Sequence, residues 1–214
     1  MTKTYPVISP KLDWGKLKLL GNEFCLDFVN TIWDPRKIPA EDYLRTFTDF
    51  LHWLRQAKGV PRSTVRDLNR WSSNNPKAAK RILLHIHMYR DELRQVFSAI
   101  AHQRRIPDRS LSFVNRKISE FLKNLEFRQV GGKVISIQRQ PESLLDRALE
   151  PITRSAFRLL RNGDHGRVHE CPRCSWVFYD TSKGGRRKWC SMDFCGSPTK
   201  SLSYYYRQKG EEAS

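Results

Sequence analysis

The sequence lacks the features that direct a protein into or across a membrane. No stretch approaches the ~18 consecutive apolar residues of a membrane span. The first twenty residues contain no apolar segment followed by a small-residue cleavage site. We therefore expect a cytoplasmic protein with no membrane partner, in a compartment where thiols stay reduced.

The sequence also lacks a recognisable catalytic constellation. Gly131-Gly132 is too short for a phosphate-binding loop and is typical of a turn. His85 and His87 are two residues apart, so they lie on different sides of a helix and do not chelate a metal together. Cys25 lies in an apolar run, which is typical of an inert buried thiol. Because a hydrolase needs an open metal site or a nucleophile with its base, we expect that the protein is not an enzyme.

Acidic residues are few relative to basic ones. The chain has 22 Asp and Glu against 39 Lys and Arg, a net charge of +17. A positive field attracts polyanions, so nucleic acid is the first partner to consider, with a merely solvated basic surface as the alternative. Residues 51–105 hold twelve basic against three acidic residues, a net +9, and residues 161–214 hold ten against six, a net +4. Both regions are therefore candidate polyanion surfaces.

The hydrophobic pattern indicates a mainly α protein. A length of 214 residues suffices for one helical domain and a small appended module. Amphipathic spacing predicts helices over 41–59, 61–73, 77–104, 108–125 and 142–163. Pro151 is expected to kink or split the last of these. Residues 127–140 form two β-prone runs around Gly131-Gly132, typical of a β-hairpin. Residues 21–31 fit either a short buried helix or a strand.

Four of the five cysteines lie within 25 residues of each other, and their spacing is that of a zinc site. Cys171 and Cys174 form a CxxC pair, and Cys190 and Cys195 follow with four residues between them. Zinc favours such tetrahedral thiolate cages. Four thiolates close the coordination sphere, so we expect one structural zinc and not a catalytic one. His165 and His169 lie nearby, but the cysteines already suffice as ligands.

The residues around the cysteines predict a small zinc module of the treble-clef or ribbon kind. Trp176, Phe178 and Trp189 are expected to pack around the metal. The β-prone run 175–180 and the turn at 183–187 predict a hairpin that links the two cysteine pairs.

Basic residues beside and beyond the cysteines are candidate nucleic-acid contacts: Lys183, Arg186, Arg187, Lys188, Lys200, Arg207 and Lys209. They alternate with Tyr204–Tyr206, and cations with aromatics suit phosphate contact at a groove edge. The alternative is a solvated surface whose tyrosines pack the small zinc core.

The zinc segment resembles the CGNR zinc-finger proteins, predicted bacterial transcription regulators related to stress. The matching residues are Cys171-x2-Cys174-x-Trp176-x-Phe178-x-Asp180, Arg186-Arg187-Lys188-Trp189-Cys190-Ser191-Met192 and Cys195-Gly196. The run Leu26-Asp27-Phe28-Val29-Asn30-Thr31 resembles the opening motif of the ABATE domain, which usually precedes that finger, and residues 144–160 resemble the helix that leads into it. The resemblance implies a helical ABATE-like domain over 1–163 and a CGNR-like finger over 164–214.

One departure from the family pattern concerns the residues after Cys195-Gly196. The motif that names the family continues with Asn and Arg, but this chain has Ser197 and Pro198, and Lys200 is the nearest cation. The metal ligands are unaffected. If the family's arginine contacts DNA, that contact is missing or displaced here.

The resemblance implies a DNA-binding transcription regulator with a helical sensory or partner-binding domain and a candidate small-molecule effector. Leu26, Asp27, Asn30 and Thr31 are the candidate lining of an effector pocket; we favour the alternative that Leu26 is core while Asp27 and Asn30 cap or bridge backbone. Two other functions stay open. The same cations and aromatics suit RNA, and zinc alone suits a protein-interaction module. The pattern does not indicate an oligomeric state.

Overall fold

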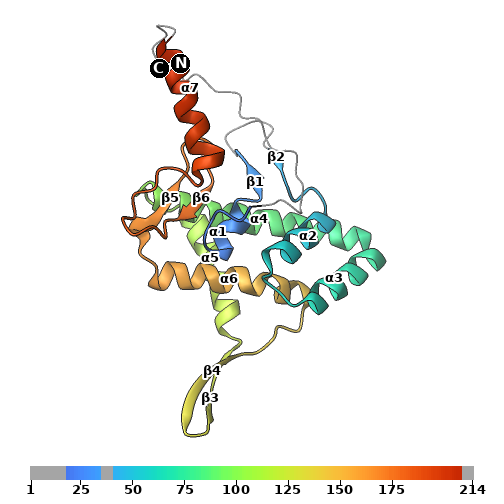
Figure 1. Ribbon diagram of the computed structural model, residues 1–214. Helices are drawn as coiled ribbons and strands as arrows, with labels where there is room; N and C mark the ends of the chain where they lie inside the picture. Colours follow the sequence, from blue (N-terminus) through green and yellow to red (C-terminus); the bar gives the residue numbers. More distant parts are fainter. Residues whose placement is uncertain (1–17, 35–40, 209–214) are drawn as a thin grey trace.

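The computed structural model describes residues 18–34 and 41–208 (Figure 1). Within these ranges the helices are α1 (Phe24–Val29), α2 (Phe47–Ala57), α3 (Arg62–Asn74), α4 (Pro76–Ala101), α5 (Asp108–Leu122), α6 (Leu144–Asn162) and α7 (Ser197–Gln208). The strands are β1 (Ile32–Trp33), β2 (Glu41–Asp42), β3 (Leu125–Val130), β4 (Lys133–Gln138), β5 (Val168–Glu170) and β6 (Val177–Tyr179). They pair as three antiparallel ribbons, β1–β2, β3–β4 and β5–β6. The expected fold class, mainly α with a hairpin, is confirmed.

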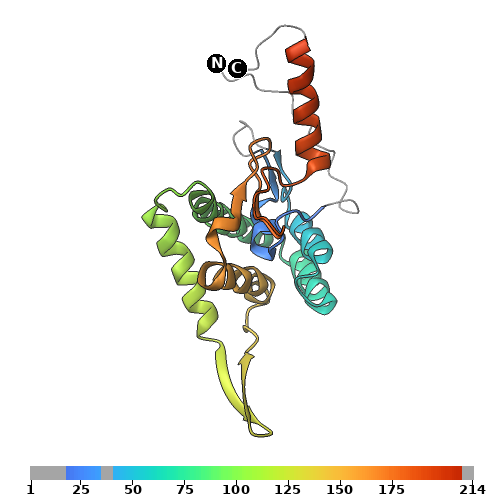
Figure 2. The ribbon, with the colours of Figure 1, turned by 60° about the vertical axis from the view of Figure 1, so that its left-hand side comes forward.

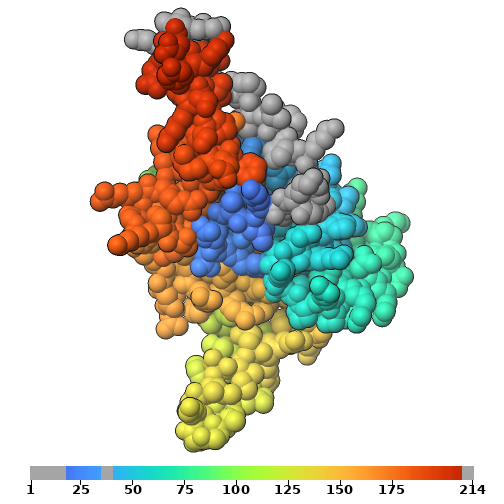
Figure 3. Space-filling model, viewed as in Figure 1, coloured from blue at the N-terminus to red at the C-terminus, as the bar shows by residue number. Residues whose placement is uncertain are grey.

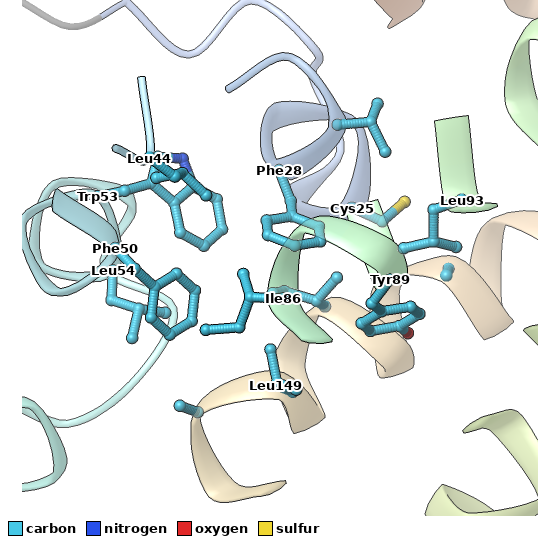
Figure 4. Close-up of a cluster of buried hydrophobic side chains, with 14 of the residues drawn as sticks. Cys25, Phe28, Leu44, Phe50, Trp53, Leu54, Ile86, Tyr89, Leu93 and Leu149 are labelled. Atoms are coloured by element: carbon cyan, nitrogen blue, oxygen red, sulfur yellow. The ribbon is translucent and has the colours of Figure 1, made fainter. Parts of the chain in front are cut away.

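Residues 21–31, which the sequence pattern left open between helix and strand, contain a short helix. Residues 24–29 form the short helix α1, which packs against α4 and α6. Its Phe28 points between Trp53 and Tyr89, with ring centroids 5.4 and 6.0 Å away (Figure 4). Burying an aromatic side chain of this size contributes about 1.5–3 kcal/mol, so α1 is held by packing and not by its own length.

The start of α2 differs from the prediction because a capping box fixes it. Thr46 Oγ1 accepts a hydrogen bond from Asp49 N at 3.1 Å, and Thr46 N donates to the Asp49 carboxylate at 2.8 Å. The helix therefore begins at Phe47, and residues 41–42 pair with β1 as strand β2. At the other end Lys58 takes the left-handed conformation, with φ 52°, and ends the helix one residue before Gly59.

The long helices build the rest of the body, and the β3–β4 hairpin projects from it. Helix α6 runs through Pro151 as one continuous helix, so of the two expected outcomes, a kink or a split, the split does not occur. Gly131 and Gly132 both have positive φ, as a two-residue hairpin turn of this kind requires. The ribbon extends away from the body, at the end opposite α7 (Figures 1 and 2). Among the described residues, no helix combines the length and the apolar character that a bilayer crossing needs.

Candidate metal centre and nucleic-acid interface

The four clustered cysteines converge on one point. All four are buried, and their sulfur atoms lie within 4.8 Å of one another. The Sγ atom of Cys174 is 3.6 Å from that of Cys190, and the Sγ atom of Cys195 is 3.7 Å from both. A tetrahedron with Zn–S bonds of about 2.3 Å has sulfur–sulfur edges of about 3.8 Å. The donor set and its spacing therefore fit a zinc ion.

The electrostatics of the cluster also favour a cation. Hydrogen bonds from Cys174, Cys190 and Cys195 hold the pKa of Cys171 below its ordinary value. Hydrogen bonds to Cys171 raise the pKa of Cys174 and Cys190 above theirs. Four buried thiols this close repel one another once they ionise, and a divalent cation is what allows all four to ionise together.

Two different local structures present the two cysteine pairs. Cys171 and Cys174 lie in the turn that joins β5 to β6, where Cys171 N bonds to the Trp176 carbonyl at 2.9 Å. Cys195 lies in a π-helical turn, Met192–Gly196, which leads directly into α7. Arg173 joins the two by donating from its guanidinium to the Phe194 carbonyl at 2.7 Å. A cysteine-bearing hairpin followed by a cysteine at a helix start is the treble-clef arrangement.

The sequence pattern predicted a hairpin between the two cysteine pairs, and this prediction is wrong about which strand β6 pairs with. β6 does form from the β-prone run, but it pairs with β5, which precedes the first cysteine pair. Residues 181–191 contain no strand in the part of the chain that the structure describes. The run 168–170 is only three residues long, so its pairing depends on the turn at Cys171–Cys174 and not on strand propensity.

Aromatic side chains from both ends of the chain enclose the cysteines. Trp176 and Phe178 are buried in one cluster with the four cysteines, and Trp189 packs against it, as expected. Two further members of this cluster, Trp33 and Tyr43, were not predicted from the sequence pattern. Trp33 meets Trp176 edge to face, with ring centroids 5.3 Å apart. The zinc cluster therefore shares its core with the N-terminal segment.

The motif at residues 26–31 fastens β6 to the body. The Asn30 carboxamide makes two bonds to Val177, accepting from its N at 2.9 Å and donating to its carbonyl at 2.8 Å. Trp176 Nε1 donates to the Ile32 carbonyl at 2.9 Å. Asp27 accepts from Gly21 N at 2.8 Å, and Gly21 O in turn receives Tyr179 N at 2.9 Å.

These bonds leave little space for an effector at Leu26, Asp27, Asn30 and Thr31. Leu26 is fully buried, and Thr31 Oγ1 donates to the Phe28 carbonyl at 2.7 Å. The cavity beside Asp27, Asn30 and Thr31 measures about 10 Å³. That volume holds about one water molecule, so we place no small-molecule ligand there.

A second set of contacts joins the zinc module to α4. Glu170 accepts a hydrogen bond from Ser98 Oγ at 2.6 Å and lies 3.8 Å from the Arg94 guanidinium. Arg94 also donates to the Ser175 carbonyl at 2.8 Å, in the loop of the first cysteine pair. Residues from α1, β1 and α4 thus fix the orientation of the module on the helical body.

Two family comparisons match this arrangement in the same order along the chain. Residues 22–163 match the ABATE family, described as "Putative stress-induced transcription regulator". The chain belongs to the ABATE family. Residues 167–208 match the CGNR zinc finger. No curated protein matches the chain closely enough to count as a relative. The ABATE protein is therefore a zinc-binding regulator by family, and neither description names an enzyme.

Most of the basic residues predicted in the CGNR finger lie on its surface. Lys183, Arg186, Lys188, Lys200 and Arg207 are exposed. Lys188 lies over the ring of Trp189, 5.5 Å from its centroid, and Arg207 Nε donates to the Ser203 carbonyl at 3.3 Å. Lys209 lies outside the described residues.

Arg187 differs from the other basic residues because its guanidinium is used inside the finger. It donates to the Cys190 carbonyl at 2.6 Å and lies over the Phe178 ring, 5.3 Å from its centroid. Its backbone N also donates to Asp180 at 2.8 Å. Burial alone would raise the pKa of Asp180, but bonds from Arg187 N and Ser182 N hold it below its usual range. Arg187 and Asp180 thus shape the loop between the cysteine pairs.

Helix α7 carries the finger's exposed surface away from the body (Figure 2). No residue of α7, which the structure describes throughout, is buried. Tyr204 and Tyr205 are 61% and 51% exposed. Ser197 and Pro198, the departure from the CGNR pattern, form the first turn of this helix, where a proline needs no hydrogen-bond partner for its nitrogen.

Proposed function

We propose that this ABATE protein is a cytoplasmic transcription regulator that binds duplex DNA through its CGNR finger. The observation that carries the proposal is α7. A helix of twelve residues is about 18 Å long and projects with none of its residues buried, which suits insertion into a major groove. Lys200 and Arg207 lie along it, and the exposed Lys183, Arg186 and Lys188 lie in the loop that leads to Cys190.

The zinc ion in this proposal is single and structural. Cys171, Cys174, Cys190 and Cys195 supply four buried sulfur ligands, which leaves no open coordination position for a substrate. The ion fixes the β5–β6 hairpin to the start of α7. We accordingly divide the chain into an ABATE body, 1–163, and a finger, 164–214, whose helix the metal orients.

RNA is the second candidate partner because two exposed tyrosines share α7 with the cations. Tyr204 and Tyr205 offer ring faces on which unpaired bases can stack. Duplex DNA is favoured because a single projecting helix matches the width of the major groove of B-DNA, whereas the major groove of an RNA helix is too narrow for it.

The test is selection of binding sites from a random duplex pool by the zinc-loaded protein at physiological salt, with total RNA as competitor. A variant with Lys200→Glu and Arg207→Glu removes two cations from α7. Its matched control, Lys123→Glu with Lys133→Glu, makes the same charge change at the end of α5 and the start of β4. The β3–β4 hairpin lies at the end of the molecule opposite α7 (Figure 3). Folding of each variant is checked by circular dichroism.

We expect the wild type and the control to enrich one motif and the α7 variant to lose it. The slope of log affinity against log salt should fall by about two in the α7 variant, one for each lost phosphate contact. If both variants lost the same DNA affinity, the interaction would depend on the overall positive charge of the protein and not on contacts from α7. If the protein stayed bound to the competitor RNA and enriched no duplex motif, RNA would be its partner in place of duplex DNA.

A further inference from the structure

Helices α2 and α3 enclose a groove of about 780 Å³ that the proposed DNA contact does not use. Each helix contributes one face at helical spacing: positions 48, 51, 52 and 55 from α2, and 62, 65, 66 and 69 from α3. Leu51, Val60 and Val65 give the groove an apolar floor, in which Leu51 is buried and the two valines are half-buried. The two helices lie beside each other at one side of the body (Figure 1).

Four cations surround this floor: Arg55, Lys58, Arg62 and Arg66. All four are exposed, and none has a hydrogen-bond or ion-pair partner for its side chain among residues 18–34 and 41–208. Some other arginines of the body are paired; Arg154, for example, meets Glu150 at 2.6 Å. The groove is therefore a place where positive charge gathers without compensation.

Acidic side chains are absent from the described residues that line the groove. The nearest acids along the chain lie elsewhere on the helices. Asp49 is held in the capping box with Thr46, and Asp67 is one position beyond Arg66, about 100° around α3 from it. A concave surface with one sign of charge focuses its field into the hollow and attracts an ion of the opposite sign.

The apolar floor and the four cations around it together indicate the kind of ligand that the groove can bind. We propose that the α2–α3 groove binds a small organic anion with an apolar body, such as an aromatic carboxylate or the phosphate ester of a planar ring. The volume lies within the ~300–1,000 Å³ of small-molecule sites. A bare phosphate would leave the apolar floor in water, and a neutral apolar molecule would leave the four cations unpaired. The binding does not depend on the proposed DNA contact.

The test uses the full zinc-loaded protein and two fluorescent probes of the same shape. Anilinonaphthalene sulfonate is an aromatic anion, and N-phenyl-1-naphthylamine is its neutral counterpart. Both are titrated into the wild type, into a variant with Arg55→Gln and Arg66→Gln, and into a control with Arg81→Gln and Arg104→Gln. The control removes two exposed arginines that do not line the groove.

We expect the dissociation constants of the anionic probe for the wild type and for the control to agree within twofold. The groove variant should weaken its binding about tenfold while it leaves the neutral probe unchanged. Competition by salicylate or by adenosine monophosphate then identifies a carboxylate or a phosphate ester as the better ligand.

Three results would overturn the proposal. The first is equal binding of the neutral and anionic probes to the wild type. The second is an equal loss in the groove variant and its control. The third is displacement of the probe by duplex DNA or by inorganic phosphate but by neither organic anion, which would make the groove a site for phosphate alone.

Discussion

Asn30 joins the two family segments through a single side chain. Its carboxamide satisfies both backbone groups of Val177, in the strand that follows the first cysteine pair. The residue is 5% exposed, so loss of its side chain leaves a buried N–H and a buried carbonyl without partners. The sequence motif that marks the start of the ABATE segment thus has its structural partner about 147 positions later in the chain.

Asn30→Ala should lower the free energy of unfolding by about 1–3 kcal/mol, because two buried polar groups lose their bonds. The measurement is urea unfolding of the zinc-loaded protein. Asn22→Gly is the matched control, since Asn22 also donates to a β6 residue, the Tyr179 carbonyl, but is exposed. Glycine avoids strain there because Asn22 has a φ of 58°. Equal effects of the two variants would refute the bridging role of Asn30.

Asp27 introduces a pH dependence of stability. Burial raises the pKa of its carboxyl to about 7, the nearby Glu23 adds to this, and the bond from Gly21 N opposes it. A carboxyl whose folded pKa exceeds its unfolded pKa stabilises the protein fully below about pH 4, and that contribution is lost as the pH rises through 7. The native protein therefore loses stability between pH 5.5 and 8 through this group.

Asp27→Asn should remove this loss. Relative to the wild type, the variant should gain on the order of 2 kcal/mol between pH 5.5 and 8, measured as the difference in urea unfolding at the two values. Glu126→Gln is the control. Although desolvation acts to raise the pKa of Glu126, hydrogen bonds from Arg139 and Arg128 hold it below its usual range, so this group titrates below the window and its variant should show a constant difference. If the effect of Asp27→Asn on the free energy of unfolding were the same at both pH values, the raised pKa of Asp27 would be contradicted.

At the scale of elements, helix ends decide where the segments of the ABATE body begin. Thr46→Ala removes the side-chain half of the capping box of α2, the bond from Asp49 N to Thr46 Oγ1, and should cost about 1 kcal/mol in thermal or urea unfolding. Ser143→Ala is the comparison, because Ser143 caps α6 with one longer bond of 3.4 Å to Asp146 N. Its effect should be the smaller one. The reverse order would show that the reciprocal box contributes no stability of its own.

The features that could be predicted from the sequence are those that depend on residues close together in the chain. Gly131-Gly132 marked the β3–β4 turn, and the cysteine spacing marked the cluster, because both depend on residues close in sequence. The β5–β6 pairing and the position of Trp33 over the cluster were missed. Both depend on contacts that the chain makes only after folding, and a three-residue strand carries no periodic pattern that could reveal it.

At the scale of the whole molecule, the zinc cluster and the helical body form one packed unit. Trp33 and Tyr43 belong to the aromatic cluster around the cysteines, while Val168 and Val177 of the finger belong to the main core. Glu170 adds polar contacts to Ser98 and Arg94 on α4. Because these contacts cross the boundary between the family segments in both directions, the finger cannot unfold without exposing part of the body's core.

Zinc removal should therefore destabilise the ABATE body as well as the finger. On chelation we expect the melting temperature of the helical signal in circular dichroism to fall, together with the tryptophan fluorescence transition, as one cooperative change. Cys174→Ser should reproduce the chelated state without chelator.

Cys25→Ala is the control. Cys25 is buried outside the cluster, and burial raises the pKa of its thiol to about 12. This variant should therefore keep one zinc per chain and the same response to chelation. If the helical signal instead melts at an unchanged temperature while the finger alone unfolds, the two segments are independent, and the contacts of Asn30, Trp33 and Glu170 do not couple them.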